Sequence, residues 1–174
     1  PSIFTMMDEV RRTLLEQGYV ENLMGRRRRF RVTTKSSDED VTEAARKAFN
    51  FIIQSAAAEI MRRALYLTDE WLMERQADEG YVEQTYQEAG MDVTVYDSLG
   101  LDCPPDWVRP ALVDVKQVME EKVFEIEPFA SIDVPLLVDV TAGGGWSNDK
   151  QLDVTYNGSE PVSIGGQPLG RLYG

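Results

Sequence analysis

The sequence has no histidine and a single cysteine among its 174 residues, and these two scarcities exclude several classes of protein. Without histidine there is no Ser-His or Cys-His catalysis and no histidine-ligated metal. A single cysteine excludes a disulfide framework and a multi-cysteine zinc site, and it is typical of a reducing compartment. Any bound metal would therefore have oxygen ligands, which favours Mg²⁺, Mn²⁺ or Ca²⁺.

Long apolar runs are missing as well, and basic residues are few. No stretch approaches the roughly 18 apolar residues of a membrane span, so we expect a cytoplasmic protein with no membrane partner. The composition, 43% hydrophobic and 28% charged, is typical of a globular chain. The 18 basic residues against 30 acidic ones give a net charge of −12, which by itself argues against nucleic-acid binding.

The charge is, however, distributed unevenly along the chain. Residues 1–63 contain twelve basic and nine acidic residues, whereas residues 64–174 contain six basic and 21 acidic ones. The first part also contains an arginine cluster at positions 26–29 and 31. Such a cluster would neutralise several phosphates of a nucleic acid, and a solvated charged turn is the alternative interpretation.

The order of the expected elements predicts an α+β fold, with helices packed on a small antiparallel sheet. Residues from about 148 onward are rich in Gly, Pro and Asn, which predicts an extended tail (148–174) that would suit docking of a partner, after a folded part (1–147). The expected elements are a helix at 3–17, a hairpin at 19–32, a long helix from Asp40 or Thr42 to about 76, strands at 91–96 and 99–103, a helix at 107–124 and a strand at 135–141.

Two patterns in these elements carry candidate chemistry. Arg46, Asn50 and Gln54 stand four residues apart on the long helix, so they share a face opposite an apolar stripe through Phe49 and Ile53. Their donors and acceptors suit phosphates and minor-groove base edges, although a solvated polar face is the alternative. Asp97, at a tight turn with Ser98, would present a carboxylate to a divalent cation, although Asp-Ser is also ordinary turn chemistry.

Four stretches in order resemble the C-terminal part of the family A DNA polymerases, the DNA polymerase I group with its bacteriophage relatives. The resemblance covers residues from about 5 to 147 and implies the C-terminal fingers and palm portion, with its small antiparallel palm sheet. The stretches are 18–28 (GYVENLMGRRR), 45–58 (ARKAFNFIIQSAAA), 95–104 (VYDSLGLDCP) and 134–140 (VPLLVDV).

The resemblance also implies roles for individual residues. Asp97 is similar to the metal-binding aspartate of motif C, where Tyr96 replaces the usual histidine and would donate a hydrogen bond to the primer end. Ser98 replaces the usual second carboxylate, a form that resembles the single-subunit phage RNA polymerases. The residues implied in DNA contacts are Arg26, Arg27, Arg28 and Arg29 at the backbone, and Arg46, Asn50 and Gln54 at the primer–template.

Motifs A and B of this family are missing from the sequence. Because two-metal nucleotidyl transfer needs a pair of carboxylates, we expect half of an active site. We therefore expect the small subunit of a split, phage-like polymerase, a heterodimer active with a larger chain that carries motifs A and B. Its other ligands would be Mg²⁺ or Mn²⁺, primer–template DNA and dNTP, and Pro1 fits removal of an initiator methionine. The alternatives are a fragment of a longer polymerase, a non-catalytic DNA-binding or scaffolding module, and part of an RNA polymerase.

Overall fold

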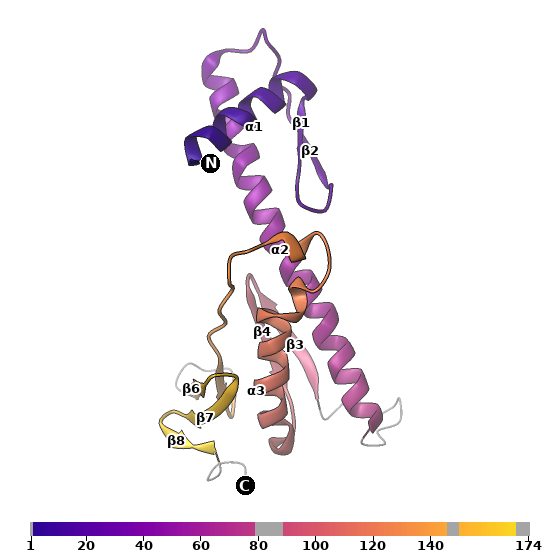
Figure 1. Ribbon diagram of the computed structural model, residues 1–174, viewed down its shortest axis with the longest axis vertical. Helices are drawn as coiled ribbons and strands as arrows, with labels where there is room; N and C mark the ends of the chain where they lie inside the picture. Colours follow the sequence, from indigo (N-terminus) through magenta and orange to yellow (C-terminus); the bar gives the residue numbers. More distant parts are fainter. Residues whose placement is uncertain (1, 79–88, 146–149, 170–174) are drawn as a thin grey trace. The chain divides into compact units, whose positions relative to one another are not determined.

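The computed structural model describes residues 2–78, 89–145 and 150–169. The chain divides into two compact units, Pro1–Ile60 and Met61–Gly174, and the long helix α2 (Asp38–Asp78) continues from the first into the second (Figure 1). The described elements are helices and small antiparallel sheets, which confirms the predicted α+β class. The domain boundary expected at residue 147 stays a prediction.

Helix α1 (Ile3–Gln17) begins and ends where the sequence predicts. The hydroxyl of Ser2 accepts a hydrogen bond from the backbone N–H of Thr5 and so caps the first turn. The helix ends at Gly18, which has the left-handed φ of 74° that glycine adopts without steric cost. The chain then enters an antiparallel hairpin of β1 (Tyr19–Glu21) and β2 (Arg27–Arg29), which confirms the predicted hairpin.

Small side chains of α2 form the core of the first unit. Ala44, Ala45 and Ala48 are buried against Val10 and Leu14 of α1. The apolar stripe predicted for α2 through Phe49 and Ile53 is wrong at one position, because Ile53 is 53% exposed. The N-cap also differs from the prediction, since the hydroxyl of Ser37, rather than Asp40 or Thr42, accepts a hydrogen bond from the backbone N–H of Asp40.

The second unit contains a two-stranded hairpin, a helix and a four-stranded sheet. Strands β3 (Gly90–Val95) and β4 (Ser98–Asp102) pair antiparallel and are followed by α3 (Pro105–Glu120) and two short 3₁₀ turns, η1 (Lys122–Phe124) and η2 (Phe129–Ser131). The helix predicted at 107–124 thus ends four residues early. The sheet has the order β5-β6-β7-β8, and its strands are β5 (Thr141–Gly143), β6 (Gln151–Asn157), β7 (Glu160–Ile164) and β8 (Gln167–Pro168).

Two sequence predictions in this unit are wrong. The strand expected at 135–141 is absent from the described residues, because strand pairing begins only at Thr141 and the preceding Leu137 is 86% exposed. The extended tail is also corrected for residues 151–169, where Ile164 and Leu169 are buried in one cluster with Leu112 of α3. Residues 148, 149 and 170–174 of the predicted tail lie outside the described residues.

Candidate active site and nucleic-acid interface

The basic turn between β1 and β2 is held in shape by one buried amide. The side-chain oxygen of Asn22 accepts hydrogen bonds from the backbone N–H groups of Met24 and Arg26, at 3.0 and 2.9 Å. Gly25 completes the turn with a φ of 72°. The backbone of the turn is thus fixed by local bonds, and the arginines that follow start from a defined position.

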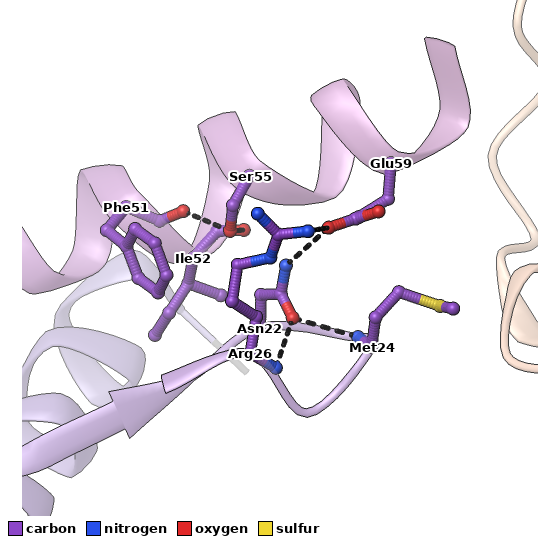
Figure 2. Close-up of polar contacts among 7 residues, drawn as sticks. All are labelled: Asn22, Met24, Arg26, Phe51, Ile52, Ser55 and Glu59. Atoms are coloured by element: carbon purple, nitrogen blue, oxygen red, sulfur yellow. Dashed lines mark hydrogen bonds and ion pairs between the residues drawn. The ribbon is translucent and has the colours of Figure 1, made fainter. Parts of the chain in front are cut away.

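A buried carboxylate on α2 joins this turn to the helix. Figure 2 shows Arg26 and Asn22 directed at Glu59, whose Oε1 lies 3.3 Å from the Arg26 guanidinium and 3.4 Å from the Asn22 amide nitrogen. Glu59 is only 7% exposed. The sequence interpretation missed both Asn22 and Glu59. The sequence does contain one signal for Glu59. It directly follows three alanines that predict close packing of the helix, and a buried glutamate needs a polar partner.

The other arginines of the cluster differ in their surroundings. Arg27 pairs with Glu21 across the hairpin, and its guanidinium lies 4.8 Å from the centre of the Tyr19 ring. The hydrogen bond with the Glu21 carboxylate raises the pKa of Arg27 above its usual value. Arg28 stacks 5.3 and 5.6 Å from the rings of Phe30 and Phe51, so it contacts α2.

The predicted polar face of α2 is exposed to solvent. Arg46, Asn50 and Gln54 are all exposed, and within the described residues their side chains make no hydrogen bond or ion pair. Phe51 and Glu59 mark the side of the helix that contacts the hairpin. Asn50 precedes Phe51 by one residue, which is about 100° around the helix, and Arg46 and Gln54 lie on the same face as Asn50. The polar face and the basic turn therefore adjoin each other within the first unit.

The second candidate site is the tip of the β3–β4 hairpin. Val95 pairs with Ser98, so the two loop residues are Tyr96 and Asp97, and the predicted Asp97-Ser98 turn is wrong by one residue. Tyr96 has a φ of 56° and is 97% exposed. The favoured two-residue hairpin turns have a positive φ at their first residue, which glycine or asparagine usually supplies. A tyrosine in this conformation costs roughly 1–2 kcal/mol.

Two tryptophans and an arginine anchor the base of this hairpin. Trp71 of α2 and Trp107 of α3 meet edge to face with ring centres 6.4 Å apart, and the Arg75 guanidinium lies 5.1 Å from the Trp107 ring. Met91 and Leu101 of the hairpin pack against this cluster. Nearby, burial raises the pKa of the Cys103 thiol. The hairpin is thus packed against the protein at its base and exposed at its tip.

The described residues do not assemble a complete metal site. They bring together no group of three or more acidic residues or thiols that would hold a metal ion. Asp97 is exposed at the hairpin tip and provides one carboxylate. None of the described helices has the length and apolarity needed to cross a membrane.

Residues 1–148 match the sequence family described as DNA polymerase family A. The chain belongs to this family. The match ends where strands β6–β8 begin, so the four-stranded sheet lies largely outside it. Within this family A chain, the basic turn and the polar face of α2 lie in the first unit and the Asp97 hairpin lies in the second.

Relatives of this family A chain include DNA polymerase I of Pseudomonas aeruginosa, which is 30% identical over 146 residues. DNA polymerase I of Streptococcus pneumoniae is 32% identical over 150 residues, and the thermostable DNA polymerase I of Thermus filiformis is 36% identical over 146 residues. These alignments cover 84%, 86% and 82% of the chain, respectively. The chain spans only 14% to 15% of the length of these relatives. It is therefore homologous to a part of DNA polymerase I, a nucleotidyltransferase of DNA replication.

Proposed function

We propose that this chain contributes a metal-binding aspartate and primer–template contacts to a DNA-directed DNA polymerase. The observation that carries the proposal is the family match together with Asp97 at the exposed tip of a firmly based hairpin. A strained, fully exposed tyrosine beside that carboxylate supports a site rather than an ordinary turn, because strain of this kind gathers at functional sites.

The residues at the hairpin tip fit part of a magnesium site. A carboxylate is the hard oxygen ligand that Mg²⁺ and Mn²⁺ prefer, and Asp97 would supply one. When bound, two Mg²⁺ ions stabilise the charge of the attacking 3′-hydroxyl and of the dNTP triphosphate. Tyr96 would donate a hydrogen bond to the primer end, while Ser98 occupies a position that usually carries a second acid.

One carboxylate is too few for two divalent ions, so the rest of the site must come from elsewhere. We infer a larger polymerase chain that carries motifs A and B and binds the incoming dNTP. In this heterodimer the present chain would act as the small subunit of a split polymerase. The Asp97-Ser98 pair favours a bacteriophage source, and the enzyme would work in the cytoplasm of an infected or bacterial cell.

Isolation from the native host tests this assembly. We expect native mass spectrometry to find the chain in a stoichiometric complex with a larger partner that contains motifs A and B, and the complex to extend a primer with Mg²⁺. Recovery inside one longer covalent polypeptide would contradict the split subunit but retain the polymerase role. If the chain is recovered with DNA but without a protein partner, and no primer is extended, the result would favour a non-catalytic DNA-binding module. Ser98 supports this alternative.

The exposed polar face of α2 gives a second test. Replacing Arg46 with alanine is expected to weaken binding of primer–template DNA about tenfold, because a hydrogen bond from a charged donor contributes roughly 1.5–3 kcal/mol. Gln54→Ala and Asn50→Ala should each have a smaller effect. Fluorescence anisotropy of a labelled duplex with a recessed 3′ end measures the affinity.

The matched control is Lys47→Ala, which removes the same charge one residue further along. Lys47 pairs with Glu43 on a different side of the helix, so its loss should change affinity by less than about twofold. Equal losses at Arg46 and Lys47 would indicate a general charge effect and would contradict a specific contact by this face.

A further inference from the structure

The arginine cluster of the first unit divides into two classes by its partners. We propose that Arg29 and Arg31 make the phosphate contacts of the arginine cluster, whereas Arg26, Arg27 and Arg28 hold the hairpin in shape. The assignment rests on the proposed function, since it presumes that the chain binds the backbone of duplex DNA. It also adds Arg31 to the site and removes from the phosphate contacts three of the arginines expected there.

Arg26 is committed to the protein itself. Its guanidinium lies 3.3 Å from a carboxylate oxygen of Glu59, which is buried on α2 and is also bonded to Asn22. Arg26 supplies positive charge to this buried carboxylate, so it is less available than an unpaired arginine to bind a phosphate. Arg26 therefore holds the turn against α2 through its ion pair with Glu59.

Arg27 and Arg28 are held by other groups. Arg27 lies directly across the hairpin from Glu21 and pairs with its carboxylate, so its charge is neutralised at short range. Arg28 stacks on Phe30 and Phe51, which ties the strand to α2. A strand alternates its side chains between two faces, so Arg28 lies on the helix side and Arg27 and Arg29 on the other side.

Arg29 and Arg31 have no such partners. Both are exposed, and neither makes a hydrogen bond, ion pair or ring contact within the part of the chain that the structure describes. Asp40 and Glu43 border the same shallow hollow as Arg31, but no oxygen of theirs comes within 4.0 Å of its guanidinium. Two unneutralised guanidinium groups, one at the end of β2 and one two residues beyond it, are available to attract a phosphate backbone.

The salt dependence of DNA binding tests this division. Each phosphate contact adds about 0.9 to the slope of log K against log salt concentration for B-form DNA. For the full chain with a labelled primer–template duplex, Arg29→Gln and Arg31→Gln should each lower that slope by about 0.9. Arg27→Gln should leave the slope unchanged, although it removes the same charge from the same face of the same strand.

A gain of contact separates this assignment from simple structural damage. Replacing Glu21 with glutamine releases Arg27 from its carboxylate, so the slope should rise by about 0.9 as Arg27 becomes a phosphate ligand. Equal slope losses in the Arg27 and Arg29 variants, or an unchanged slope for Glu21→Gln, would overturn the division while DNA binding itself stands. If the unsubstituted chain fails to bind the duplex even at low salt, the proposed DNA contact itself is wrong.

Discussion

Replacing Asp97 with asparagine is expected to lower primer extension by about a thousandfold or more, and to leave the affinity for primer–template DNA within about twofold. The substitution keeps the shape of the side chain and removes the charge that would hold a divalent ion. A thousandfold loss corresponds to about 4 kcal/mol of transition-state stabilisation, within the several kcal/mol that a catalytic metal supplies. Single-turnover extension by the complex with the larger chain, at saturating Mg²⁺, measures the effect.

Asp92→Asn is the matched control for this experiment. Asp92 lies on β3 of the same hairpin and is also exposed, but it is away from the tip. Extension by this variant should stay close to that of the unsubstituted complex. Undiminished extension by Asp97→Asn would contradict the metal-binding role. If affinity for DNA falls together with extension, a folding defect rather than a lost metal ligand would be the cause.

Replacing Ile164 with alanine is expected to lower the free energy of unfolding by about 3 kcal/mol. Ile164 is 2% exposed and packs with Leu112 and Leu169, so its truncation leaves a cavity in the core of the second unit. Substitutions of this kind cost roughly 2–5 kcal/mol. Urea unfolding followed by tryptophan fluorescence measures the change in midpoint.

Val162 provides the comparison on the same strand. It lies two residues from Ile164 and is 43% exposed, so Val162→Ala should cost less than about 1 kcal/mol. Equally small effects at Ile164 and Val162 would mean that these strands are not part of the core.

The strands also bond to α3 through Tyr156. Its hydroxyl donates a hydrogen bond to the backbone oxygen of Leu112 at 2.9 Å, and burial raises the pKa of Tyr156 to about 12.

The helices of this chain could be predicted from its sequence because each carries local signals. A left-handed glycine directly after an amphipathic run ends α1 at Gly18. The four-residue spacing of Arg46, Asn50 and Gln54 places them on one exposed face, whatever the helix packs against. Asp97 at a hairpin tip was predictable for a similar reason, since short apolar strands on either side leave only a tight turn between them.

The errors fall where long-range contacts decide the structure. Residues 135–141 have the apolar character of a strand, but a strand also needs a hydrogen-bonding neighbour, which local sequence does not specify. The C-terminal segment is an exception, because its turn signals are local and its Gly, Pro and Asn content nevertheless predicts a tail. Asn157 pairs with Glu160, so Gly158 and Ser159 form the loop between β6 and β7, and a two-residue loop that begins with glycine is a strong hairpin signal. Glu59 was missed because its partners, Asn22 and Arg26, are more than thirty residues away in sequence.

The left-handed backbone of Tyr96 makes this position a point of local frustration in the energy landscape. The hairpin loop favours glycine there, so a sequence optimised for stability alone would place glycine at residue 96. That change would relieve the strain and at the same time remove the exposed aromatic side chain next to Asp97. Thermostabilisation of this protein should therefore leave residue 96 unchanged and begin in the buried parts of the two units.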